Sequence, residues 1–117
     1  MSLAITTRII SGVVILDMSG RLLPSEGTLR VYIRQQLEAG YRSFVLNLAD
    51  LPYIDSFGLG ELVTMWTSIR TAGGESTLLR PTENIRKLLR ITKLDSVFQI
   101  SADEAGAVRS LTSVIAT

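Results

Sequence analysis

Cysteine and histidine are both absent from the 117-residue chain. Without them the protein has no disulfide, no thiol nucleophile, no histidine metal ligand and no copy of the commonest general base. The chain also lacks an apolar run near the roughly 20 residues that span a bilayer, and residues 1–10 lack the charged start and apolar centre of a signal peptide. These absences argue against most enzyme classes and predict a cytoplasmic protein without membrane insertion.

Net charge is small as well. Lys and Arg total 12 and Asp and Glu total 11, which leaves a formal charge of +1. No overall field attracts nucleic acid or an anionic membrane, so partners must be recognised by local surfaces. A chain of this length predicts one domain, residues 1–117, with a core that needs no covalent staple. Its oligomeric state stays open.

Nucleotide-binding and hydrolytic motifs are missing too. Gly58 and Gly60 do not start a dinucleotide fingerprint, because Val63 occupies the position of the third glycine. No Walker motif is present. A hydrolytic site would depend on Asp50 and Asp55 alone. We therefore predict no catalytic residue, no metal site and no cofactor.

The chain alternates between strand and helix patterns. Residues 4–10 and 13–18 are rich in aliphatic and β-branched side chains and are separated by Ser11-Gly12, which predicts a tight hairpin. Further strands are expected at residues 44–48, 76–79 and 97–100. Helices are expected from near residue 25 to 40, after 56, after 82, and after a capping box formed by Ser101 and Glu104.

This order of elements predicts an α/β fold with a mixed, mostly parallel sheet. The first strand is an antiparallel addition, and right-handed connections should collect about four helices mainly on one face. Trp66 is expected in the core. The outer face of the helix after residue 82 carries four cations, which fit a solvated surface better than a nucleic-acid site: Arg86, Lys87, Arg90 and Lys93.

Residues 51–60 connect the most apolar strand to the longest helix, whose inward stripe is expected to be Leu59, Leu62, Val63, Trp66 and Ile69. Asp55 and Ser56 stand at the helix start, and either is a preferred N-cap. Gly58 and Gly60 fall in the first turn, where glycine costs about 1 kcal/mol relative to alanine. The glycines indicate either tight packing of the helix start or bare backbone open to a macromolecule or a phosphate.

Residues 47–60 read Asn-Leu-Ala-Asp-Leu-Pro-Tyr-Ile-Asp-Ser-Phe-Gly-Leu-Gly. This segment combines an N-L-x-D-L element, an aromatic-aliphatic pair and D-S-x-G-L-G between a strand and a helix. It resembles the signature of the STAS family, the anti-sigma factor antagonists, and the resemblance extends over nearly the whole chain. The resemblance implies that the chain binds an anti-sigma factor that is also a serine kinase. It also implies that this kinase phosphorylates Ser56 and so ends the binding, and that a phosphoserine phosphatase removes the phosphate.

Two positions depart from the family pattern. Phe57 follows Ser56 where many phosphorylated members have a small polar residue. The loop after Gly20 is Arg21-Leu22-Leu23, where the best-known members carry acidic residues that engage the kinase. We expect Leu22 and Leu23 to tuck under a helix or, with Arg21, to contact the partner.

The predicted partner surface lies around the helix start. It comprises Asp55, Phe57, Gly58, Gly60, Glu61 and Met65, with the loop Arg21, Leu22 and Leu23 beside it. Phe57 could instead fold back onto Tyr53 or that loop. Two alternatives to the phospho-switch remain: an accessory subunit of a transport or stress-signalling complex, and a sensor of nucleotides or other small molecules.

Overall fold

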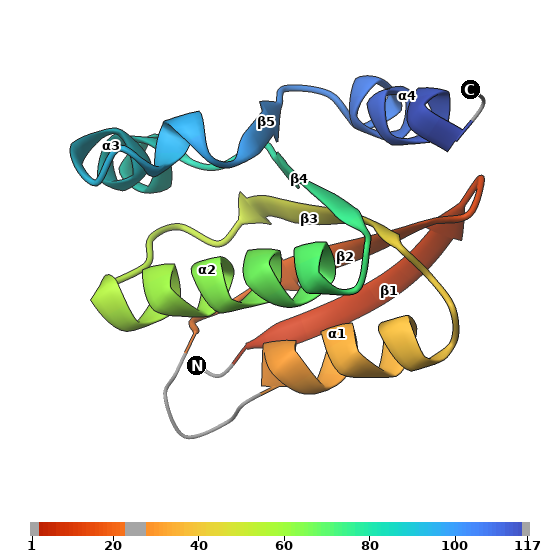
Figure 1. The fold of residues 1–117 in the computed structure, drawn as a ribbon. Coiled ribbons are helices and arrows are strands. Elements are labelled where there is room, and N and C mark those ends of the chain that lie inside the picture. Colours follow the sequence, from red (N-terminus) through yellow and green to blue (C-terminus); the bar gives the residue numbers. More distant parts are fainter. Residues whose placement is uncertain (1–2, 23–27, 116–117) are drawn as a thin grey trace.

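The computed structural model describes residues 3–22 and 28–115, and within them five strands form one sheet in the order β1-β2-β3-β4-β5 (Figure 1). The strands are β1 (Ala4–Ile10), β2 (Val13–Ser19), β3 (Ser43–Asp50), β4 (Glu75–Leu79) and β5 (Gln99–Ser101). β1 pairs antiparallel with β2, and each later pair is parallel. The predicted mixed sheet is confirmed.

The helices are α1 (Thr28–Glu38), α2 (Ser56–Thr71), α3 (Glu83–Ile91) and α4 (Glu104–Ile115), with a short 3₁₀ turn at Leu94–Ser96. The buried side chains of α1, α2 and α3 share one core on one face of the sheet. α4 packs on the opposite face through Ala107 and Leu111, and Figure 1 shows it across the sheet from α1 and α2. Three helices therefore lie on one face, as expected, and the last helix does not.

Connection handedness explains this division. α1, α2 and α3 each join two parallel neighbours, and successive strands are added in one direction across the sheet. Right-handed connections then place all three helices on the same side. α4 follows β5 and leads into no further strand within the described residues, so that rule does not constrain it. It covers the face that the other helices leave open.

Because both faces are covered, β2 and β3 are apolar almost without alternation. Val14 and Leu16 face the three-helix core, whereas Val13 and Ile15 face α4, and all four are fully buried. The hairpin before β2 turns through Ser11 and Gly12 at φ 52° and 78°. Two consecutive left-handed residues match the twist of an antiparallel ribbon.

Two sequence expectations were wrong in detail. β5 begins at Gln99, because the N–H groups of Val97 and Phe98 both donate to the Leu94 carbonyl at 3.0 Å, in the preceding turn, and not to β4. The Phe98 ring packs edge-on against Trp66 with ring centroids 6.5 Å apart. At the start of α4 the cap is Asp103, whose Oδ2 accepts the Gly106 N–H at 2.8 Å. Within the described residues, no helix has both the length and the apolar character needed to cross a membrane.

Candidate functional site

The connection from β3 to α2 is anchored by two buried side chains. Leu51 is fully buried and Ile54 is 7% exposed. Pro52 and Tyr53 between them are exposed, and the Thr82 hydroxyl donates to the Pro52 carbonyl at 3.0 Å. The two buried side chains and the hydrogen bond from Thr82 fix the backbone of the connection. Asp55 and Ser56, which follow it, are therefore held at the surface in a defined position.

Asp55, and not Ser56, is the N-cap of α2. The Asp55 backbone is extended, and its Oδ1 accepts the Gly58 N–H at 2.9 Å. Ser56 is the first residue of the helix, and its side chain is exposed. Its hydroxyl forms no hydrogen bond with any other residue in ranges 3–22 and 28–115. The capping role is filled by its neighbour, which leaves the Ser56 hydroxyl available for chemistry.

The two glycines of the first turns have different surroundings. A Cβ at Gly58 would lie 2.9 Å from Ile54 Cβ and 3.4 Å from Leu22 Cδ1, so Gly58 permits tight packing of the helix start. At Gly60 a Cβ would meet nothing within 4 Å, and the residue is exposed. Of the two explanations that the sequence left open, tight packing applies to Gly58 and bare, open backbone to Gly60.

The loop after β2 lies beside this helix start. The Arg21 guanidinium stands 5.6 Å from the centre of the Tyr53 ring, and Leu22 is buried next to Gly58. Leu23 lies outside the described residues. Arg21 and Tyr53 also line an open hollow of about 810 Å³ at the ends of β1, β2 and β3. Tyr53, which is 44% exposed, is a surface residue that was not included in the predicted partner surface, although it lies in the connection that the sequence singled out.

Met65 does not belong to the exposed surface, contrary to the prediction. It is 1% exposed, because α1 packs along the flank of α2 that was expected to face outward. Glu61 on the same flank has a side chain that is only 11% exposed, and its Oε1 lies 3.8 Å from Arg30 Nε. Phe57 is half-buried. The inward side of α2 is centred on Leu62, Met65 and Ile69 rather than on Trp66, which is half-buried at its edge.

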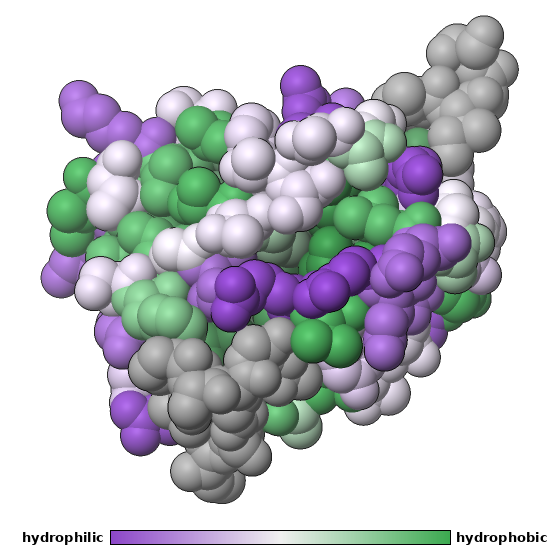
Figure 2. Space-filling view, turned by 60° about the horizontal axis from the view of Figure 1, so that its bottom comes forward, coloured by the Kyte–Doolittle hydropathy of each residue, from purple (hydrophilic) through white to green (hydrophobic). Residues whose placement is uncertain are grey.

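Apart from Arg70 in the last turn, the exposed residues of α2 carry no charge. The uncharged stripe begins at Ser56 and consists of small or hydroxyl-bearing residues: Ser56, Gly60, Thr64, Thr67, Ser68 and Thr71. Figure 2 shows the side of the molecule that carries α1 and α2, where surface of intermediate hydropathy adjoins strongly hydrophilic and hydrophobic areas. A solvated helix face ordinarily carries charged residues. This stripe therefore extends the candidate surface along α2 from Ser56.

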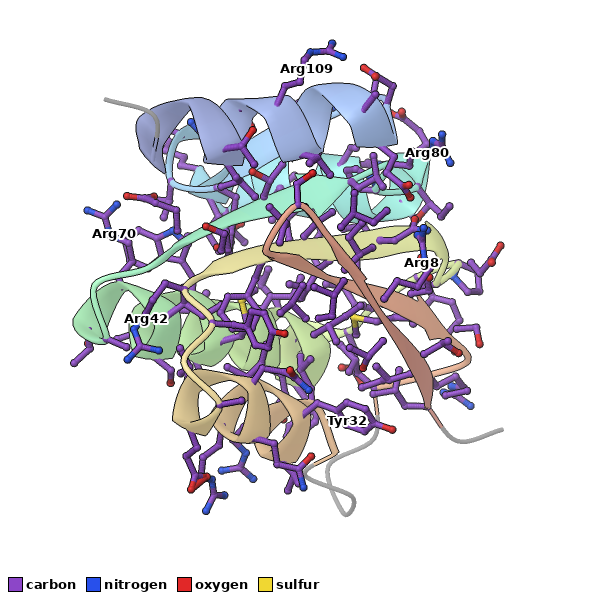
Figure 3. All side chains as sticks on the ribbon, turned by 90° about the vertical axis from the view of Figure 1, so that its right-hand side faces the viewer. Arg8, Tyr32, Arg42, Arg70, Arg80 and Arg109 are labelled. Carbon is purple, nitrogen blue, oxygen red and sulfur yellow. The ribbon has the colours of Figure 1, made fainter. Side chains whose placement is uncertain are left out.

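The strongest electrostatic cluster lies elsewhere, on the α4 side of the sheet (Figure 3). Arg8 donates to Asp17 at 2.5 Å and to Glu104 at 2.6 Å, and the Asn47 amide donates to Asp17 at 2.7 Å. Hydrogen bonds from Arg8 hold the pKa of the Asp17 carboxyl, and that of Glu104, below their ordinary values. The cluster joins β1, β2, β3 and α4, so its role is to fix that helix to the sheet.

A family model described as the STAS domain matches residues 4–107. The chain belongs to the STAS domain family. Its relatives are named as regulators: a Thermotoga maritima protein, provisionally named an anti-sigma factor antagonist, is 39% identical over 64 residues, which are 55% of this chain and 57% of the relative. The anti-sigma-B factor antagonist of Bacillus subtilis is 36% identical over 62 residues, 53% of this chain and 57% of the relative. The matched segment thus spans little more than half the length of these STAS relatives.

Solved structures agree with this membership. A crystal structure of a Thermotoga maritima protein, also provisionally named an anti-sigma factor antagonist, has a TM-score of 0.83 at 30% identity and covers 92% of this chain and 94% of its own. The anti-sigma factor antagonist SpoIIAA in its unphosphorylated form has a TM-score of 0.69 at 18% identity, covering 92% and 96%. The second likeness shows the STAS fold alone.

Proposed function

We propose that this STAS domain is an anti-sigma factor antagonist that binds an anti-sigma factor with serine-kinase activity in the cytoplasm. Phosphorylation of Ser56 ends the binding, and a phosphoserine phosphatase restores it. The observation that carries the proposal is the division of labour at the start of α2: Asp55 caps the helix, and the Ser56 hydroxyl is exposed beside it. The family membership and the names of the relatives support the class of partner.

Phosphorylation would act on binding rather than on folding. The phosphate adds about −1.5 to −2 charges at the N-terminus of α2, where the helix dipole and free N–H groups accommodate an anion. Asp55 is adjacent, however, so the interface would receive a concentrated negative charge. An unpaired charge buried in an interface costs roughly 2–5 kcal/mol, which is about 30- to 5,000-fold in affinity. The modified protein should remain folded and release its partner.

The proposed partner surface differs from the one expected from sequence. Its exposed members are Arg21, Tyr53, Asp55, Ser56 and Gly60, with the uncharged stripe of α2 beyond them. Two residues of the surface predicted from the sequence, Leu22 and Gly58, are buried and do not offer a contact surface. They pack against each other and support the start of α2 from below. Arg21 and the adjacent Tyr53 ring offer an Arg–aromatic pair, a combination common at binding hot spots.

The test uses the kinase-type anti-sigma factor encoded nearest to this gene, purified and incubated with the protein and ATP. Ser56→Ala should bind the partner and accept no phosphate, whereas Ser56→Asp should stay folded and bind at least tenfold more weakly. Ser96→Asp, which places the same charge on an exposed serine of the 3₁₀ turn, outside the proposed surface, is the matched control for position.

Mass spectrometry locates the phosphate, and calorimetry measures affinity with and without ATP. Equal affinity for the wild type and both Ser56 variants, with no phosphate on Ser56, would contradict the switch. Persistent binding unaffected by ATP would favour the accessory-subunit alternative, which the half-buried Phe57 next to Ser56 makes worth testing.

A further inference from the structure

A slot lies between α1 and α2, away from Ser56. Its volume is about 280 Å³, and its lining is divided between an apolar floor and a basic rim: Ile33, Leu37 and Met65 below, Arg30 and Arg34 on the α1 rim, and Ser68 on the α2 rim. Ile33 is 2% exposed and Met65 is 1% exposed, so the floor belongs to the packed core and is already formed.

The two rims of the slot differ in charge. Arg30 and Arg34 lie one turn apart on α1, and both are exposed. Arg30 is loosely paired with Glu61 at 3.8 Å, and Arg34 forms no ion pair with any residue in the described ranges. The opposite rim is formed by Ser68 of α2. The one carboxylate of α2, that of Glu61, is only 11% exposed and already faces Arg30, so the exposed part of this rim is uncharged. The slot therefore combines an apolar floor, a cationic wall and a neutral wall.

We infer that this slot docks an amphipathic, acidic α-helix of a partner protein. One aliphatic side chain of that helix enters the slot, and carboxylates one turn apart on its flank meet Arg30 and Arg34. Side chains at positions i and i+4 of a helix stand on one face, which matches the spacing of the two arginines. Guanidinium groups bind carboxylates in a planar, two-point geometry.

The neutral wall supports the same occupant. A helix that lies in a groove brings its backbone and small side chains close to both walls. Hydroxyl-bearing and glycine residues on α2 permit that approach without burying an unpaired charge. The contact lies outside the Ser56 switch and does not depend on phosphorylation.

Two other occupants fit less well. A volume of about 280 Å³ is at the lower limit of small-molecule pockets, which run from about 300 to 1,000 Å³. A second copy of the chain in a symmetric dimer would bring its own Arg30 and Arg34 towards the same basic rim, because a two-fold interface opposes identical patches. Like charges in such a contact are unfavourable.

The experiment uses two designed helical peptides with leucines at identical positions, one with glutamates and the other with lysines on both flanks. ¹⁵N-labelled protein is titrated with each peptide and followed by NMR. The acidic peptide should shift the amide signals of Arg34, Met65 and Ser68 and bind more weakly as salt rises. The lysine peptide should bind at least tenfold more weakly, a difference of about 1.4 kcal/mol.

Two matched pairs of variants locate the contact. Arg34→Glu should weaken the acidic peptide about tenfold, whereas Arg86→Glu, the same change at an exposed arginine of α3, should leave its affinity within about twofold. Ser68→Trp should fill the slot and abolish binding. Ser96→Trp, the same change at an exposed serine of the 3₁₀ turn that does not line the slot, should not. Melting curves of all four variants verify folding.

Equal binding of both peptides would overturn the inference, as would an absence of shifts at the slot at millimolar peptide. Dimerisation in sedimentation experiments that Ser68→Trp removes would overturn it in favour of a second copy. None of these results bears on Ser56, whose phosphorylation is measured with the kinase.

Discussion

Gly58 and Gly60 lie two residues apart in α2, and replacing each by alanine should change stability in opposite directions. A Cβ at Gly58 would stand 2.9 Å from Ile54 Cβ and 3.3 Å from Ile54 Cγ2. The nearer atom is bonded directly to the backbone carbon of Ile54, so it moves away only if the connection before α2 shifts. At Gly60 the added methyl group meets nothing within 4 Å.

The two variants share one favourable term. Alanine is better than glycine in a helix by about 1 kcal/mol, partly because it restricts the unfolded chain. Gly60→Ala should therefore gain about 0.5–1 kcal/mol. Overpacking a closely packed site costs about 1–3 kcal/mol, so Gly58→Ala should lose up to about 2 kcal/mol after the same gain. Because the helix term is common to both, the difference between the variants isolates the steric cost.

Urea unfolding followed by circular dichroism measures both free energies, and unchanged m values would show that the unfolded states are comparable. The expected result is a higher midpoint for Gly60→Ala than for the wild type and a lower one for Gly58→Ala. If both variants gain equally, the helix start is not tightly packed at Gly58, and the account of how Ser56 is positioned is refuted.

Three further predictions concern the cap, the ion cluster and α4. Asp55→Ala should cost about 1 kcal/mol in urea unfolding and Ser56→Ala almost nothing, because only Asp55 caps α2; the reverse order would return the cap to Ser56. Arg8 lowers the pKa of Asp17 and of Glu104 in the folded state. The ion pairs of Arg8 therefore stabilise the folded state above the ordinary pKa values of these carboxyls, near 4, and this stabilisation is lost as pH falls through the lower pKa values of the folded state. Arg8→Met should lose about 1 kcal/mol at pH 7, since the cluster is partly exposed, and should lose less additional stability than the wild type between pH 5 and pH 2; parallel pH profiles would contradict this. Ending the chain at residue 100 removes the buried contacts of α4, worth on the order of 5 kcal/mol, and should unfold a domain of this size in thermal melts; an unchanged melting temperature would show that α4 is dispensable.

Local patterns in the sequence were sufficient for the order of elements, the hairpin and the start of the helix that carries the proposed site. Strand and helix periodicities depend on the geometry of a few neighbouring residues, so they are readable without tertiary contacts. Glycine and proline mark where those patterns end. The strand-helix connection with its Asp-Ser pair and glycines predicted a helix start at residues 55–56, and the structure begins α2 there.

The choice between Asp55 and Ser56 as cap required the tertiary structure. Both residue types cap helices, and one residue of displacement in the helix start exchanges their roles. Burial of Leu51 and Ile54, with the hydrogen bond from Thr82, determines where the connection ends and the helix begins. These contacts join segments about 30 residues apart, which no local pattern records.

Met65 and α4 show the same limit for helix faces. Periodicity assigns an inward direction to α2 only to within about one residue, or 100° around the axis. Whether the flank that carries Met65 is covered depends on how closely α1 packs beside α2, and that follows from the lengths of their connections and the twist of the sheet. α4 is amphipathic and could bury its apolar side on either face of the sheet. The open apolar surface of β2, β3 and β4 decided its side, because burying that surface is the larger free-energy gain.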